Sequence, residues 1–223
     1  MNAETAQFVL FAVTGVGAVV WVAGLRFLVA SHRAGKNPPV ERFGLAEPPE
    51  NLIAGTAEVE GRPAELAAKA ASVMARENVG TIGMLKILER TDDRVAFEAV
   101  GPGQSGGSRG QFVGRGQLRF SPAARGRTRI DYAVEVSGGR GLLLGGAIFQ
   151  VLGLVALVAG FWLIRTYIIP NQDPAIRGQT FQMLQVVHVL WPPFLFGGLY
   201  RGRHTAVRTA FDTLVHNLPY HAD

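Results

Sequence analysis

The sequence predicts an α+β integral membrane protein, with three transmembrane helices and a small cytoplasmic domain of antiparallel strands and helices. Three long runs are almost free of charge, and the segment between the first two runs shows the short alternating pattern of β-strands. We expect five parts: an N-terminal transmembrane anchor (1–30), a proline-rich linker (31–51), an α+β domain (52–137), a transmembrane helical hairpin (138–202) and a C-terminal amphipathic helix that docks on the sheet (203–223).

The composition agrees with membrane spans joined to a polar part. Of the 223 residues, 48% are hydrophobic and 17% are charged, and the mean hydropathy is +0.19. Soluble globular proteins usually carry about 25% charged residues. So much apolar surface excludes a largely disordered chain. Because the chain has no cysteine, disulfides, thiolate zinc sites and a cysteine nucleophile are excluded.

Each of the three runs is long enough to cross the roughly 30 Å hydrocarbon core of a bilayer as a helix. The first covers 8–30, and its acidic leader favours an uncleaved anchor over a signal peptide. The second covers 141–164. The third, 178–200, contains glutamines and a histidine, and Asp173 followed by proline indicates a helix start ahead of it. The alternative for the third run is an interfacial or re-entrant helix broken at Pro192.

Arginine and lysine near the ends of the runs predict the orientation, because cytoplasmic flanks carry more positive charge. The N-terminal leader has no basic residue. The flanks of the α+β domain and the segment after the third run have most of them: Arg26, Arg33, Lys36, Arg42, Arg140, Arg201, Arg203 and Arg208. We therefore expect the N-terminus outside, with the α+β domain and the C-terminus in the cytoplasm, in a bacterial inner membrane.

The α+β domain is predicted from alternation and helical periodicity. Strands are expected at 52–60, 82–90, 94–100, 111–120 and 127–136, and a helix at 63–77. A domain of this size buries little surface and needs another element to cover the sheet. The C-terminal segment 203–218 supplies one, since its apolar residues recur every three or four positions.

In residues 55–66 (GTAEVEGRPAEL) a first strand leads through a proline-bearing turn into a helix; two hairpins follow, and then a tail helix centred on Phe211. This order resembles the START-like, helix-grip superfamily, often labelled SRPBCC. The resemblance covers roughly residues 51–137 and 203–218 and is interrupted by the membrane hairpin. It implies a curved sheet that holds an apolar ligand against the C-terminal helix. It carries over no individual functional residue.

The membrane runs contain residues suited to helix packing, because small residues let helices approach and polar residues need partners there. If the second and third runs form a hairpin, Gln150 lies at about the depth of His188. We expect these two to hydrogen-bond to each other or to a common partner helix. The predicted packing and partner residues are Gly146, Gln150, Gly153, Gly160, His188 and Trp191.

His188 has a second interpretation as a ligand. An imidazole nitrogen can coordinate the metal of a haem or of a chlorophyll-type pigment. A membrane haem usually has a second axial ligand, and no other histidine lies in an apolar run. We therefore predict no metal and no cofactor, with haem or chlorin ligation by His188 as the alternative.

A cluster of arginines around the second hairpin forms a basic surface: Arg109, Arg115, Arg119, Arg125, Arg127 and Arg129. Such a surface suits anionic lipid headgroups or a partner protein. The alternative is a solvated face paired with nearby carboxylates such as Asp131 and Glu135. Nucleic acid is not expected as a partner, because few aromatic residues are interleaved with the arginines.

The sequence predicts a protein that is not an enzyme. It has no Ser/His/Asp or HExxH spacing, and no carboxylate within an apolar run as a proton relay requires. We expect a non-catalytic accessory or assembly subunit of a larger membrane protein complex, with other membrane-protein subunits and membrane lipids as partners. The alternative is a membrane-tethered START-like module that binds a lipid or another apolar ligand.

Overall fold

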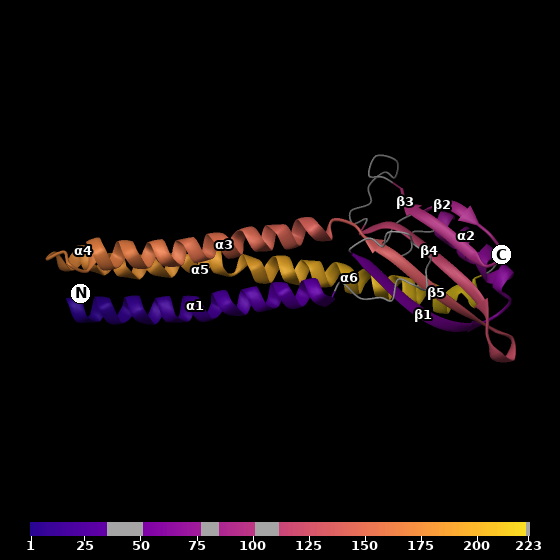
Figure 1. The fold of residues 1–223 in the computed structure, drawn as a ribbon, viewed down its shortest axis with the longest axis horizontal. Helices are drawn as coiled ribbons and strands as arrows, with labels where there is room; N and C mark the ends of the chain where they lie inside the picture. The colour runs from indigo at the N-terminus through magenta and orange to yellow at the C-terminus, as the bar shows by residue number, and fades with distance from the viewer. Residues whose placement is uncertain (35–50, 77–84, 101–111, 222–223) are drawn as a thin grey trace. The chain divides into compact units, whose positions relative to one another are not determined.

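The computed structural model describes residues 1–34, 51–76, 85–100 and 112–221, and the chain forms two compact units (Figure 1). The first unit consists of Met1–His32 and Arg140–Tyr200, and the second of Arg33–Gly139 and Arg201–Asp223. Both units therefore combine segments that are far apart in the sequence.

The first unit is helical. It contains α1 (Ala3–Ala34), α3 (Gly139–Leu163), the π-helical turn η3 (Ile164–Ile168), α4 (Pro174–Gly178), the 3₁₀-helix η4 (Gln179–Val186), α5 (Val187–Leu190) and the first part of α6 (Pro192–Asn217). Within this unit α1, α3 and the run of α5 and α6 lie side by side (Figure 1). Three stretches are long and apolar enough to cross a membrane, as predicted: Ala3–Ala34, Gly139–Ile168 and Pro174–Tyr220.

Many large apolar side chains of these helices point outward. Phe8 is 74% exposed and Val19 69% exposed on α1, and Val151 and Val158 are similarly exposed on α3. Extended apolar surfaces of this kind mark contacts with a membrane or with another protein.

The third apolar stretch begins ahead of its apolar residues, which confirms the predicted start. The Asp173 carboxylate caps α4 by accepting a hydrogen bond from the Ala175 N–H at 2.8 Å. The stretch is nevertheless not a regular helix, because η4 is a 3₁₀-helix and α5 ends at Leu190. A new helix begins at Pro192, since a proline has no N–H with which to continue the old one.

The sequence analysis places a boundary between two parts at residues 202 and 203, and one helix crosses it. α6 continues from Pro192 to Asn217 as one helix, so the end of the third run and most of segment 203–218 share it. No proline lies between Pro193 and Pro219 to interrupt its hydrogen bonds.

The second unit contains a five-stranded antiparallel sheet in the order β1-β5-β4-β3-β2, which confirms the α+β fold class. Its strands are β1 (Leu52–Glu60), β2 (Leu85–Arg90), β3 (Arg94–Ala99), β4 (Val113–Pro122) and β5 (Arg127–Val136). β1 and β5 pair along their full length, from Leu52 opposite Glu135 to Glu60 opposite Arg127. Both predicted hairpins are present, although residues 82–84 and 111 lie outside the described part of the chain.

Helix α2 (Pro63–Arg76) and the last part of α6 pack on one face of the sheet. Both helices share a hydrophobic core with the strands, to which they contribute, among others, Leu66, Ala70, Met74, Val207, Phe211 and Leu214. We call this the inner face of the sheet. The opposite, outer face carries the alternating charged residues of β4 and β5.

Three aromatic rings fill the space between α6 and the inner face. Phe211 stacks on Phe97 with 5.5 Å between ring centroids and on Tyr132 with 5.7 Å, and all three side chains are fully buried. Two strand glycines leave room for the rings. A Cβ at Gly116 would lie 2.5 Å from the Phe97 ring, and one at Gly55 would overlap the Tyr132 ring. The core therefore depends on glycine at these two positions.

Candidate functional site

Gln150 is buried in the helical unit and is held by α1. Its side-chain Nε2 donates a hydrogen bond to the Trp21 backbone oxygen at 2.6 Å, and the Trp21 indole Nε1 donates to the Gln150 backbone oxygen at 2.7 Å. Its Oε1 lies against Gly24, where a Cβ would be 3.0 Å away. Since a polar side chain among apolar helices needs such partners, the reciprocal pair fixes α3 against α1.

This geometry corrects the predicted Gln150–His188 hydrogen bond. Trp21 offers both a carbonyl acceptor and an indole donor to Gln150, so Gln150 turns toward α1 and not toward α5. His188 lies on α5 with an exposed side chain. Gln150 is therefore hydrogen-bonded to α1, and among the described residues His188 does not share this partner helix.

Three glycines of α3, Gly146, Gly153 and Gly160, were predicted to pack against other helices, and they contact helices of this chain. A Cβ at Gly146 would lie 2.7 Å from Leu28 of α1. A Cβ at Gly160 would lie 2.7 Å from the Met183 sulfur of η4, and one at Gly153 would lie 3.0 Å from a leucine of α5. These glycines let the helices of the unit approach one another closely.

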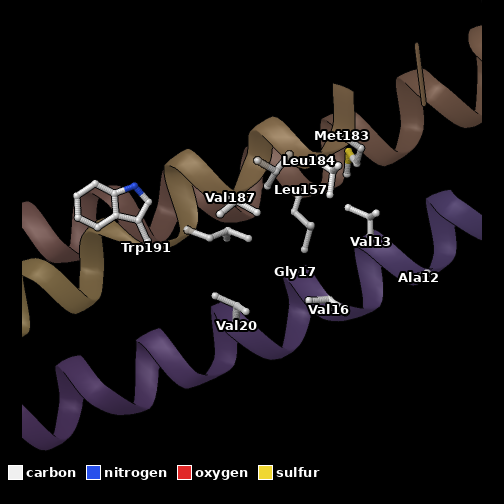
Figure 2. A pocket seen from close by; sticks show the side chains of 12 residues that line it. Ala12, Val13, Val16, Gly17, Val20, Leu157, Met183, Leu184, Val187 and Trp191 are labelled. Atoms are coloured by element: carbon white, nitrogen blue, oxygen red, sulfur yellow. The ribbon is translucent and has the colours of Figure 1, made fainter. Parts of the chain in front are cut away.

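An apolar groove of about 250 Å³ opens between α1 and the η4–α5 segment (Figure 2). Alanine, valine, glycine, leucine, methionine and tryptophan form its lining, including Val13, Val16 and Val20 of α1 and Leu184, Val187 and Trp191 of the third stretch. Trp191, which was predicted to face an interface or a partner, is 48% exposed at the edge of this groove. The groove offers no hydrogen-bonding side chain other than the indole, so it suits an apolar chain or helix.

The predicted basic surface lies on the outer face of the sheet. Three of its arginines are ion-paired with carboxylates of neighbouring positions: Arg115 with Glu98 at 3.9 Å, Arg127 with Glu58 at 3.8 Å and Arg129 with Asp131 at 3.1 Å. Arg119 lies opposite Asp131 in the β4–β5 register, and Arg125 is exposed in the turn with a φ of 60°. Arg109 lies outside the described residues. The ion pairs neutralise part of the charge that an anionic partner would meet.

A hollow of about 310 Å³ opens on the same outer face. Its apolar lining includes Leu52, Leu88 and Ala133, and its polar lining includes Arg115 and Glu135. Leu52 is 4% exposed and Ala133 1% exposed. Protein–protein contacts likewise combine apolar and polar side chains.

A partly buried hydrogen bond joins α6 to the sheet. The Tyr132 hydroxyl donates to the Asp212 carboxylate. Burial, followed by this hydrogen bond and the negative charge of Asp212, raises the pKa of the Tyr132 hydroxyl far above its ordinary value. The hydroxyl is therefore neutral at physiological pH and remains a donor. The sequence analysis did not identify Asp212, because one carboxylate on an amphipathic helix forms no distinctive pattern.

No group of three or more histidine, cysteine, aspartate or glutamate side chains that would hold a metal ion occurs within residues 1–34, 51–76, 85–100 and 112–221. His188 itself is exposed on α5.

Comparison with models of protein families, with curated proteins and with solved structures finds no match to this chain.

Proposed function

We propose that the protein is a non-catalytic accessory or assembly subunit of a larger membrane protein complex. The observation that carries this proposal is the aromatic core of the sheet unit. The rings of Phe97, Tyr132 and Phe211 occupy the space between the sheet and α6 that a START-like module needs for its ligand. This packing supports binding at surfaces over binding in the core of the sheet unit.

Two kinds of surface support docking. The helical unit has outward-facing apolar side chains on all three of its long stretches, such as Val16 at 65%, Val155 at 58% and Val187 at 53% exposure. The outer-face hollow adds a surface of mixed apolar and charged lining on the sheet unit. A subunit that docks in the membrane and at the membrane surface needs both.

In this proposal the three apolar stretches span the membrane, with the N-terminus outside and the sheet unit in the cytoplasm. The excess of arginine and lysine beside the sheet unit supports this orientation. Because the chain has no cysteine, single cysteines test it in whole cells with a membrane-impermeant maleimide. We expect labelling of Asn2→Cys and protection of Arg125→Cys until the cells are lysed. Labelling in the reverse order would overturn the orientation.

Cross-linking in native membranes tests the docking role. A photo-reactive amino acid is placed at exposed Val16, Val155 or Val187, and at Leu10, which is 1% exposed, as the matched control. We expect exposed positions to form adducts with one defined second protein, and we expect that protein to co-purify in fixed stoichiometry in mild detergent. The Leu10 variant should give no adduct with it. Adducts with lipid alone, together with purification of this chain alone, would overturn the proposal.

The alternative function is a membrane-tethered module that binds a lipid or another apolar ligand. One observation favours it, the apolar groove of about 250 Å³ (Figure 2). Mass spectrometry of the protein after gentle extraction tests it. A single apolar species should be bound stoichiometrically, and it should be lost when exposed Val16, which lines the groove, is replaced by tryptophan. Purification without any bound apolar species would exclude this alternative.

A further inference from the structure

The third apolar stretch carries a straight line of polar side chains. η4 is a 3₁₀-helix over Gln179–Val186, and residues three apart eclipse one another in such a helix. Gln182 and Gln185 therefore lie directly in line, and His188, just beyond in α5, continues the line. All three side chains are exposed. We name Gln182, Gln185 and His188 the polar stripe.

The other two faces of η4 pack inside the helical unit and line the apolar groove. Thr180 and Met183 are buried at 0% and 3% exposure and form the face that packs inside the helical unit. Leu184 and Val187 form the second face, which lines the apolar groove (Figure 2). With three residues per turn the polar stripe is the remaining, third face. It therefore points away from both the packing side and the groove.

The polar stripe lies within the apolar depth of the helical unit. The third apolar run covers 178–200, so its middle lies at Val189, next to Leu190. Leu190 therefore marks mid-depth. At a rise of about 1.5–2 Å per residue, His188, Gln185 and Gln182 lie about 3, 8 and 14 Å from that level. All three are within about 15 Å, half the thickness of a hydrocarbon core.

These side chains have no partner in the part of the chain that is described. No side-chain hydrogen bond joins Gln182, Gln185 or His188 to another described residue. Gln150, in contrast, is satisfied by Trp21 within the unit. Polar side chains at this depth are costly in contact with lipid and characteristically face another helix.

We propose that the polar stripe is a self-association surface, through which two copies of this chain pair along η4 and α5. This inference rests on the membrane location proposed above. Copies of one chain insert with the same topology, so their stripes run parallel and lie at the same depths. A two-fold axis along the membrane normal then places Gln185 opposite Gln185 of the second copy.

The chemistry of the polar stripe is self-complementary. A glutamine amide is both donor and acceptor, and a neutral imidazole also has one donor and one acceptor. Two identical stripes therefore satisfy each other, whereas a different helix would have to present matching polar groups at the same three depths. Neither glutamine of the stripe carries a charge that opposes the approach of a second copy.

The absence of cysteine makes the test direct. Single-cysteine variants of the full chain are oxidised in native membranes at native expression. We expect a disulfide-linked homodimer from Gln185→Cys. The matched control is Leu184→Cys, a neighbour at nearly the same depth that is 51% exposed but lies on the groove face. Val155→Cys on α3, which is 58% exposed, is the second control. Both controls should cross-link weakly or not at all.

A second measurement tests the hydrogen bonds themselves. Energy transfer between two fluorescent copies in vesicles should report association of the wild-type chain. The double variant Gln182→Leu, Gln185→Leu should weaken that association by about tenfold or more, as expected for the loss of interhelical hydrogen bonds. Val155→Leu should leave it unchanged.

Three results would overturn self-association by the polar stripe: equal cross-linking from Leu184→Cys and Gln185→Cys, no homodimer from either, or a cross-link from Gln185→Cys only to a different protein. The last result would leave the accessory-subunit proposal standing. A homodimer that purifies without any second protein would have the opposite meaning, since it supports the polar stripe and contradicts the accessory role.

Discussion

Replacing Phe211 by alanine tests whether the aromatic stack is the core of the sheet unit. The ring is fully buried and stacks on both Phe97 and Tyr132, so its removal leaves a cavity between α6 and the sheet. Phe→Ala at such a site costs about 3–5 kcal/mol, a large part of the roughly 5–15 kcal/mol by which a domain is stable. At about 1.4 kcal/mol per factor of ten, the unfolded fraction should rise about 100- to 4,000-fold.

Hydrogen exchange of the full chain in lipid nanodiscs is the suitable assay, because it reports on individual strands. Tryptophan fluorescence is not suitable, since all three tryptophans, Trp21, Trp162 and Trp191, lie in the helical unit. The amides of β5 should exchange faster in Phe211→Ala by the factor given above. Thr209→Ala, at an exposed position of the same helix, is the matched control and should change stability by less than about 0.5 kcal/mol.

Exchange of β5 that stays within about threefold of wild type in Phe211→Ala would refute the reasoning. Such tolerance is expected of a sheet that closes over a ligand, where one wall residue is dispensable. That result would therefore favour the START-like alternative.

Three further outcomes follow from the contacts described. Because the pKa of Tyr132 is raised in the folded state, the free energy of unfolding should fall as pH rises above about 10, where only the unfolded tyrosine ionises. Pulse proteolysis should show a shallower fall for Tyr132→Phe, and an equal fall would contradict the raised pKa of Tyr132. Gly160→Leu should overpack α3 against η4 and destabilise the helical unit by about 1–3 kcal/mol in thermal unfolding. Gly141→Leu, where the added side chain meets open space, should not destabilise it, and equal effects of the two variants would argue against the contact between Gly160 and Met183. Gln150→Leu should cost about 0.6–1.7 kcal/mol and be non-additive with Trp21→Phe; strict additivity would show that the two residues do not interact.

The fold class was predictable because its signals are local. Long uncharged runs predict the three apolar stretches, and alternation predicts each strand within a few residues. The ends of helices were less predictable. Arg201 and Arg203 end the uncharged run, but a charge marks a possible membrane boundary and does not interrupt backbone hydrogen bonds, so α6 continues through both. The 3₁₀ geometry of η4 has no marker in the sequence of Gln179–Val186 that we recognise.

The partner of Gln150 was not predictable from depth alone. His188 was chosen because a hairpin places the two residues at similar depth, but the rotation of α3 about its axis decides which neighbour its side chain meets. That rotation is set by the close approach of Gly146 to Leu28 and by the space at Gly24. Contacts of this kind depend on three helices at once and are not visible in any one run.

The mass of the assembly extracted from native membranes tests the central proposal most directly. Native mass spectrometry of the tagged chain at its natural expression level measures the composition and stoichiometry of what it is bound to. The account predicts a complex that contains one or two copies of this 23.9 kDa chain together with at least one different membrane protein. A species made only of this chain, alone or with lipid, would contradict the account.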